Sequence, residues 1–391
     1  MRILFTGGVT GGHIMPLISV AEKLPIVAQS RGIPSLEFFY LGVPGMYAQE
    51  LTSKGITVSR VASVKMRRGA IIRNIIELPL LIVAIIQALW RVYWIMPDVL
   101  FSKGGPGALP VVLACAFYRI PIIIHESDSV AGLTNLASAR FAKRIAIAYA
   151  TAKESFVGTP ASDVARAAIE QKIALIGNPI RNFFLTSFDT TDRATVKRIM
   201  DFDPAKPLLV VIGGSQGAVR INEFLLSIAE DLLTRNIQVL HQTGVNNIGS
   251  VKGDLALVMK KYSNMYQHAY RAVPYFEEDI KDAYCAADIV ISRAGSGSIF
   301  EIAAMGRPAI LIPLPQEISR DQVKNAFEYA ATGAAITIEE SNLTRNIFLD
   351  QLDRLLANPT MLASMAAAAK AFSRPEAAEV LAKEIVHLGR R

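Results

Sequence analysis

The sequence predicts an α/β protein built from two similar domains, each with the fold of a nucleotide-binding domain. Short apolar runs alternate with helical stretches in both halves of the chain, as in layered α/β folds. Each half also begins with a strand that leads into a glycine-rich loop, Gly7–Gly12 in the first half and Gly213–Gly217 in the second. A length of 391 residues is enough for two domains of ordinary size.

The apolar runs predict strands in both halves. In the first half these are Arg2–Thr6, Ser35–Leu41, Val99–Ser102, Pro121–His125 and Arg144–Ala148. In the second half they are Leu208–Ile212, Gln238–Thr243, Ile289–Ser292 and Ala309–Pro313. A turn signal at Gly177–Pro179 marks the domain joint. We therefore expect domains at 1–180 and 181–370, and a C-terminal helix at 371–391 that packs back on the first domain.

Composition limits the classes of function. The formal net charge is +7, so the surface field favours anionic partners such as phosphorylated ligands, acidic lipid headgroups or nucleic acid. Cys115 and Cys285 lie far apart and lack metal-binding spacing, so neither a zinc site nor a disulfide scaffold is expected. No charged leader precedes a long apolar stretch, so we expect no signal peptide and a cytoplasmic protein.

The segment Ile75–Met96 is strongly apolar. Its uninterrupted run, Leu78–Ile86, is much shorter than the roughly 20 apolar residues that a spanning helix needs, so we expect no span. Basic residues precede the segment and aromatic residues end it, which suits a helix lying in the interface of an anionic membrane. The alternative is an ordinary buried helix that packs on the sheet.

The first glycine loop lies between the strand Arg2–Thr6 and a helix expected over Pro16–Leu24. Its glycines let the backbone approach a diphosphate, and the helix N-terminus offers unpaired N–H groups. The spacing does not match the dinucleotide fingerprint. His13, at the edge of the loop, could take a proton from an attacking hydroxyl. The alternative is a structural hydrogen bond at the helix start.

Two further loops in the second half repeat this pattern. Gly213–Ala218 is a second phosphate cradle, with the Ser215 hydroxyl as a donor. The run Ser296–Ser298 leads into a helix expected over Ser298–Met305, which places Glu301 in the first turn. There the carboxylate could bind the hydroxyls of a ribose or only cap the helix.

A pair of amides follows in the next helix. If that helix begins near Ser319, then Gln322 and Asn325 share one face and could read sugar hydroxyls, although a solvated face is the alternative. We find no acidic pair suited to a metal-bound diphosphate, no ATP loop and no nucleophile elbow. A bound diphosphate would therefore be neutralised by main-chain N–H groups, helix dipoles and Arg181.

Taken together, these motifs resemble the MurG family in the same order over nearly the whole chain. The motifs that carry the resemblance are Gly8–His13, His125-Glu126 with Gly132–Asn135, Gly177–Arg181, Gly213–Ala218, Arg293–Glu301 and Gln322–Ala326. Enzymes of this family transfer N-acetylglucosamine to undecaprenyl-diphospho-muramoyl-pentapeptide in peptidoglycan synthesis.

The resemblance implies the GT-B arrangement, in which the parallel sheets of two Rossmann-like domains face each other across a cleft. It implies an inverting transfer without metal or cofactor, from a UDP-sugar to an undecaprenyl-linked acceptor. It also implies a peripheral enzyme on the cytoplasmic face of the plasma membrane, bound to an anionic membrane surface through Ile75–Met96. No nucleic-acid partner is expected.

The resemblance also assigns site residues. It makes His13 the catalytic base and places Gly104, Gly105, His125 and Glu126 on the acceptor side. Uracil would lie at Phe276 and Glu277, ribose at Glu301, and the sugar at Gln322 and Asn325. The full set implied for UDP-GlcNAc is Thr10, Gly11, Gly12, Asp128, Arg181, Ser215, Phe276, Glu277, Ser296, Gly297, Ser298, Ile299, Phe300, Glu301, Gln322 and Asn325.

The chain departs from the family pattern on the acceptor side. Asp128 stands where the family usually has Asn, and Pro106 stands where it has an aromatic residue. These changes leave room for another acceptor, such as diacylglycerol. The motifs are also compatible with a UDP-sugar 2-epimerase of the same fold and with a non-catalytic binding subunit.

Overall fold

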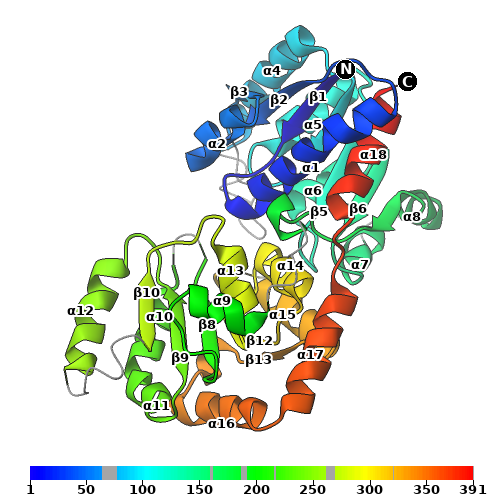
Figure 1. The fold of residues 1–391 in the computed structure, drawn as a ribbon. Coiled ribbons are helices and arrows are strands. Elements are labelled where there is room, and N and C mark those ends of the chain that lie inside the picture. The colour runs from blue at the N-terminus through cyan, green and yellow to red at the C-terminus, as the bar shows by residue number, and fades with distance from the viewer. Residues whose placement is uncertain are drawn as a thin grey trace. The chain divides into compact units, whose positions relative to one another are not determined.

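The computed structural model describes residues 1–63, 77–158, 162–185, 192–214, 217–260, 269–319 and 321–390. The chain divides into two compact units (Figure 1). Unit 1 is Met1–Asn182 together with Arg374–Arg391, and unit 2 is Phe183–Ser373. Each unit contains its own parallel sheet flanked by helices, so the predicted α/β class with two Rossmann-like sheets is confirmed.

The described part of unit 1 contains a seven-stranded sheet in the order β3-β2-β1-β4-β5-β6-β7, with every pair parallel. The order reverses between β1 and β4, and sheets of this type bind ligands at the carboxyl ends of such strands. The strands are β1 (Arg2–Thr6), β2 (Glu37–Gly42), β3 (Ile56–Arg60), β4 (Val99–Ser102), β5 (Ile122–Glu126), β6 (Arg144–Ile147) and β7 (Ile173–Leu175).

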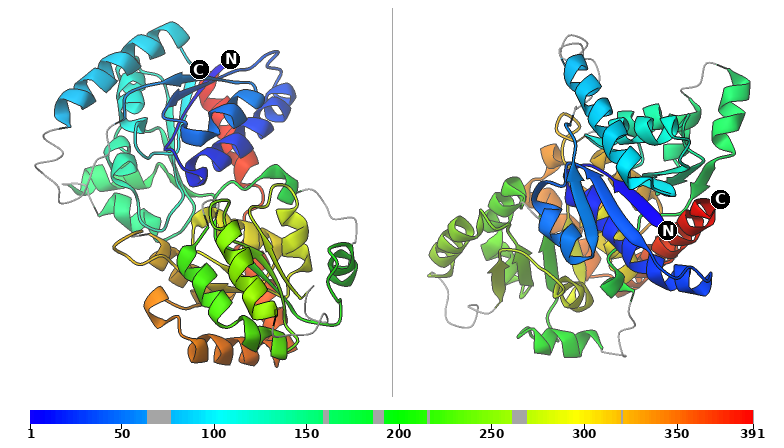
Figure 2. Two further views of the ribbon diagram at one scale, coloured as in Figure 1. Left: turned by 90° about the vertical axis from the view of Figure 1, so that its left-hand side faces the viewer. Right: turned by 90° about the horizontal axis from the view of Figure 1, so that it is seen from above.

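Alternate side chains of the central strands fill two cores, one on each face of this sheet. Ile3 and Phe5 of β1 pack with α1 (Gly11–Ser30) and α18 (Ala377–Gly389), whereas Leu4 packs with α4 (Leu78–Ile95) and α5 (Ala108–Phe117). The views in Figures 1 and 2 show α18 lying along α1, although the two helices stand at opposite ends of the sequence. The smaller helices of unit 1 are α2 (Ala48–Ser53), α6 (Leu133–Ser138), α7 (Ala152–Val157) and α8 (Asp163–Glu170).

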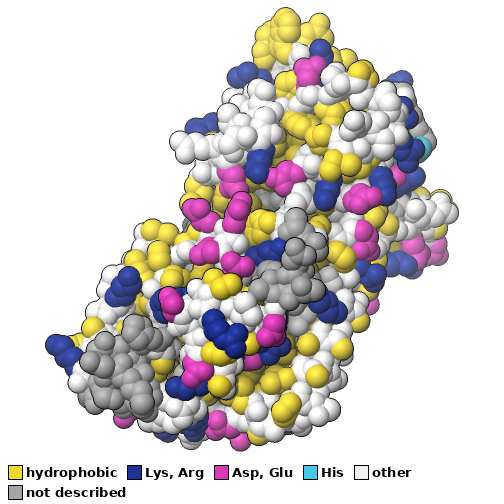
Figure 3. All heavy atoms as spheres, in the orientation of Figure 1, with side chains coloured by type: hydrophobic (Ala, Val, Ile, Leu, Met, Phe, Trp, Pro, Cys, Tyr) yellow, Lys and Arg dark blue, Asp and Glu magenta, His cyan; other side chains and the backbone are white. Residues whose placement is uncertain are grey.

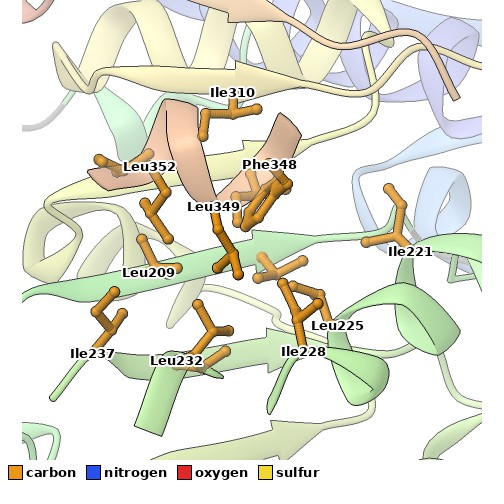
Figure 4. Close-up of a cluster of buried hydrophobic side chains, with 14 of the residues drawn as sticks. Leu209, Ile221, Leu225, Ile228, Leu232, Ile237, Ile310, Phe348, Leu349 and Leu352 are labelled. Carbon is orange, nitrogen blue, oxygen red and sulfur yellow. The ribbon is translucent and has the colours of Figure 1, made fainter. Parts of the chain in front are cut away.

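The described part of unit 2 contains a six-stranded parallel sheet in the order β10-β9-β8-β11-β12-β13. Its strands are β8 (Leu208–Ile212), β9 (Gln238–Gln242), β10 (Tyr270–Val273), β11 (Ile289–Ser292), β12 (Ala309–Leu311) and β13 (Ala335–Thr337). Its helices are α9 (Arg193–Ile199), α10 (Val219–Ser227), α11 (Ala229–Thr234), α12 (Ile248–Met259), α13 (Ile280–Ala286), α14 (Ser296–Met305), α15 (Gln322–Ala331), α16 (Arg345–Leu356) and α17 (Pro359–Phe372). Buried aliphatic residues of β8, α10, α11 and α16 form one core of this unit (Figure 4).

Helix α4 is attached to unit 1 along one stripe. Ala84, Ala88 and Val92, spaced four residues apart, are fully buried, and Ala88 and Val92 belong to the core that includes α5. The rest of the helix is largely exposed, and Figure 3 shows hydrophobic side chains gathered at the end of unit 1 where α4 lies. The exposed side chains are Leu78, Leu80, Ile82, Val83, Ile86, Trp90, Tyr93, Trp94 and neighbouring Met96.

The helix is longer than the apolar run Leu78–Ile86 on which the expectation of no membrane span depends, and that expectation stays a prediction. The helix continues through Gln87 and Arg91 for 18 residues and, among the described residues, is the one long and apolar enough to cross a bilayer. Length and composition do not by themselves separate a spanning helix from other apolar helices. Ile75 and the basic residues that precede α4 lie outside the described residues.

Candidate functional site

The carboxyl ends of β1 and β4 bring His13 against two glycines. An added Cβ at Gly8 would lie 2.9 Å from His13 Nδ1, and one at Gly105 would lie 2.9 Å from His13 Nε2. Gly105 also has φ +82°, a conformation that side-chain-bearing residues rarely adopt. The two loops therefore close around the imidazole only because both positions are glycine.

The hydrogen bonds of His13 suit a general base. Helix α1 starts at Gly11, five residues before the expected Pro16, so His13 stands in its first turn and its ring is held beside Thr10. His13 Nδ1 lies 2.9 Å from Thr10 Oγ1. If Nδ1–H donates to this hydroxyl, the lone pair is at Nε2, the atom over Gly105.

Burial is the main cause that lowers the pKa of His13 to about 4, and the nearby Lys103 cation lowers it further. The imidazole is therefore neutral at neutral pH and can accept a proton. Gly11 and Gly12 follow the same loop, and an added Cβ at Gly11 would lie 2.8 Å from the hydroxyl of Tyr47.

Side chains at the end of β5 lie in the interior and support the loops. His125 is fully buried, and its Nε2 donates to the carbonyl of Gly177 at 2.9 Å. Glu126 accepts hydrogen bonds from the Asn135 side chain and from the main-chain N–H groups of Gly132 and Asp128. Burial raises the pKa of Glu126 to about 7. The buried side chains of His125 and Glu126 therefore affect a ligand chiefly by fixing the conformation of the main chain around it.

The remaining predicted residues of unit 1 include Gly104, Asp128 and Arg181. Gly104 packs against Asn135, where an added Cβ would overlap the side-chain amide. Asp128 and Arg181 are half-buried. Burial raises the pKa of Glu50, while the Lys54 and Arg181 cations act to lower it.

Sequence reasoning missed Lys103, the residue between β4 and Gly104. Its ammonium is buried and donates to His125 Nδ1 at 2.6 Å, to Ser127 Oγ at 2.5 Å and to Asn178 Oδ1 at 3.3 Å. The available signal was a lysine directly after an apolar strand and before two glycines, in the region where such sheets bind ligands.

In unit 2 two glycines after β8 adopt conformations that side-chain-bearing residues rarely adopt. Gly214 has φ +86° and Gly217 has φ +78°, and an added Cβ at Gly217 would overlap the carbonyl of Thr243. The Gln242 side chain donates to the Gly214 carbonyl at 2.8 Å and fixes the loop. Ser215 lies outside the described residues.

The placement of Glu301 in a first helical turn is wrong. Helix α14 begins at Ser296 instead of Ser298, with Gly295 as its N-cap, so Glu301 is the sixth residue of the helix. Ser296 and Gly297 therefore supply N–H groups at the helix start, and Ser298 is half-exposed. The side chains of Ile299 and Phe300 face the core, so only their main chain could meet a ligand.

Some of the other residues predicted to bind UDP-GlcNAc are buried, and others are accessible. Phe276 is buried, whereas Glu277 next to it is exposed. Helix α15 begins at Gln322 instead of near Ser319. Gln322 Oε1 accepts from the Leu314 N–H at 3.1 Å, and the fully buried Asn325 donates weakly to the Ala294 carbonyl at 3.4 Å.

Comparisons with known proteins identify both units as domains of one glycosyltransferase family. Residues 3–147 match the glycosyltransferase family 28 N-terminal domain, and residues 208–381 match the glycosyltransferase family 28 C-terminal domain. A Legionella pneumophila protein is 31% identical over 388 residues, which are 99% of this chain and 97% of that protein. It is described as a UDP-N-acetylglucosamine–N-acetylmuramyl-(pentapeptide) pyrophosphoryl-undecaprenol N-acetylglucosamine transferase.

Solved structures agree as well. The crystal structure of Acinetobacter baumannii MurG is similar with a TM-score of 0.72 and 25% identity, covering 98% of this chain and 99% of that one. A Neisseria meningitidis UDP-GlcNAc 2-epimerase bound to UDP-GlcNAc has a TM-score of 0.67 over 99% of this chain and 100% of that one. At 12% identity it shows only a shared fold.

The fold is thus that of GT-B glycosyltransferases, and the identity extends over the full length of named relatives. The chain belongs to glycosyltransferase family 28 and, within it, to the MurG family of UDP-N-acetylglucosamine–N-acetylmuramyl-(pentapeptide) pyrophosphoryl-undecaprenol N-acetylglucosamine transferases.

Proposed function

We propose that this protein transfers N-acetylglucosamine from UDP-GlcNAc to undecaprenyl-diphospho-muramoyl-pentapeptide, with inversion at the anomeric carbon and without a metal ion. The observation that carries the proposal is the neutral His13 imidazole held between Gly8 and Gly105 at the carboxyl ends of β1 and β4. Family membership supplies the substrates.

His13 is the catalytic base in this proposal. The acceptor hydroxyl attacks the anomeric carbon as the bond to UDP breaks, and its proton passes to His13 Nε2. The bond from Nδ1 to Thr10 orients the ring and fixes the tautomer. A base of this kind contributes about 10²–10⁴-fold to the rate.

The leaving UDP carries a diphosphate, whose negative charge main-chain donors can stabilise. Gly213 and Gly214 after β8 and the start of α14 at Ser296 provide such N–H groups in unit 2. Glu301 accepts the ribose hydroxyls, Glu277 lies on the uracil side, and Gln322 binds the sugar. Arg181 of unit 1 adds a positive charge.

The lipid acceptor requires a membrane surface, and α4 is suited to one. Its stripe of Ala84, Ala88 and Val92 packs on the protein, so lipid cannot surround the helix as it surrounds a free span. We infer that α4 lies in the interface as a peripheral anchor, at the cytoplasmic face of the plasma membrane. Arg60 and Arg91 line a cavity beside the exposed ring of Trp90, and neither pairs with a carboxylate of a described residue, so both can meet anionic headgroups.

A panel of donors and acceptors tests the proposal. Radiolabelled UDP-GlcNAc, UDP-glucose and UDP-galactose are each incubated with short-chain undecaprenyl-diphospho-muramoyl-pentapeptide and with diacylglycerol. We expect transfer from UDP-GlcNAc to the muramoyl acceptor to dominate. Preferred transfer to diacylglycerol would overturn the acceptor, and acceptor-independent release of UDP would indicate epimerase chemistry instead.

A further inference from the structure

Lys103 connects three loops of unit 1 through one buried ammonium. The residue follows β4, and its main-chain N–H donates to Thr6 of β1 at 2.9 Å. Its side chain, 2% exposed, reaches the end of β5 at His125 and Ser127 and the turn after β7 at Asn178. All three protons of the ammonium therefore have acceptors, at the end of β5, in the loop after it and in the turn after β7.

The side chains of Lys103 and His13 start from neighbouring points of the main chain. An added Cβ at Gly7 would lie 3.4 Å from the Cβ of Lys103 and 3.6 Å from the Cβ of His13, so the two side chains flank the same glycine. Among the described residues, the titratable groups that face Lys103 are His125, Glu126 and Asp128 from β5 and its loop and His13 from α1. The turn at Asn178 contributes no charge.

The Lys103 ammonium can offset the effect of a negatively charged substrate on His13. The acceptor of the proposed reaction carries a diphosphate, and a nearby negative charge favours the imidazolium form of a histidine. An imidazolium cannot accept the hydroxyl proton. A buried positive charge opposes this effect, because it disfavours a second cation beside it.

We propose that Lys103 is a positioning residue for the transfer reaction: its buried ammonium holds together the chain segments that surround His13, and its positive charge acts on that imidazole. The inference rests on the transfer reaction proposed above and assigns that reaction a residue outside the predicted site. Lys103 touches no substrate in this role and acts through His13.

The direction of the pH effect follows from the local charges. Burial lowers the pKa of Lys103 to about 7, while Glu126 and Asp128 act to raise it. The charged Lys103 lowers the pKa of His13, an effect second to burial. Removing the charge therefore raises the pKa of His13, and the acidic limb of kcat/KM moves to higher pH.

The test is the titration of His13 by NMR in histidine-labelled full-length protein, with the signal assigned through His13→Asn. We compare wild type, Lys103→Met, and Lys172→Met as a matched control at another lysine of unit 1. The pKa of His13 should rise in Lys103→Met and stay unchanged in Lys172→Met. In transfer assays Lys103→Met should show an upward shift of the acidic limb and a kcat lower by about 10²-fold, because small displacements of a base cost rates of that order.

A folded Lys103→Met variant in which His13 titrates as in wild type would overturn the inference. If that variant does not fold, Lys103→Gln replaces it, since its amide can keep hydrogen bonds to Ser127 and Asn178 without the charge. The same rise is expected there. An unshifted His13 in Lys103→Gln, or failure of both variants to fold, would assign Lys103 to the fold alone. Because the titration uses protein without substrates, it remains valid even if the wild-type enzyme transfers a different sugar.

Discussion

Gly105 offers the sharpest single test of the site geometry. In Gly105→Ala the new methyl group would lie 2.9 Å from both His13 Nε2 and Gly8 Cα, where ordinary contacts are 3.4–4 Å. The loops must therefore separate by several tenths of an ångström. Alanine at φ +82° adds a backbone cost of about 1–2 kcal/mol, and relief of the overlap adds about 1–3 kcal/mol.

Gly105→Ala should lower both the free energy of unfolding and kcat, by separate causes. We expect a lower free energy of unfolding by the sum of these two costs, measured by urea denaturation. Because His13 is displaced, kcat for transfer should fall by about 10²-fold. UDP affinity, measured by calorimetry, should stay close to wild type, since the predicted UDP-GlcNAc contacts other than Asp128, Arg181 and the first loop are in unit 2.

Gly32→Ala is the matched control. Gly32 has φ +70° and no atom within 4 Å of an added Cβ, so this substitution carries the backbone cost without the overlap. It should lose about 1–2 kcal/mol of stability and retain full activity. A folded Gly105→Ala enzyme with the turnover of Gly32→Ala would refute the claim that the two loops confine His13.

Three further substitutions probe the base, the donor site and the membrane surface. His13→Ala should reduce kcat by about 10²–10⁴-fold with little change in UDP affinity, and wild-type turnover would remove His13 from its role. Glu301→Ala should chiefly weaken UDP binding, by about tenfold if one charged hydrogen bond to ribose is lost; unchanged calorimetry would contradict the ribose assignment. The double substitution Trp90→Ser with Trp94→Ser should weaken binding to anionic vesicles by at least about tenfold, because two exposed aromatic rings lose their lipid contact. Ile199→Ser, at an exposed aliphatic residue of unit 2, should leave vesicle binding unchanged, and equal loss in both variants would count against α4.

The sequence predicts the central strands well and the outer strands poorly. β1, β4, β8 and β11 have the predicted bounds because strands buried on both faces consist of continuous apolar runs. Four outer strands were not predicted, because each has partly or fully exposed positions in place of a continuous buried run. These are β3, β7, β10 and β13.

At the site, the sequence did not predict where α14 and α15 begin or that Lys103 is buried. Small polar residues such as those around Ser296 and Ser319 fit both a loop and a first turn, so the starts of α14 and α15 were misplaced by two or three residues. In the sequence, only the position of Lys103 between an apolar strand and two glycines sets it apart from a surface lysine. Only the folded sheet brings His125, Ser127 and Asn178 together from separate loops to receive its ammonium.

The proposed mechanism is an inverting transfer without a bound metal ion, in which main-chain N–H groups stabilise the leaving diphosphate and His13 accepts the proton. The most direct measurement is to form the product from UDP-GlcNAc and the short-chain lipid acceptor in excess EDTA, following the rate and then the anomeric configuration by proton NMR. We expect a β-linked N-acetylglucosamine product at an undiminished rate. An α-linked product, or loss of transfer that added divalent ions restore, would contradict the account.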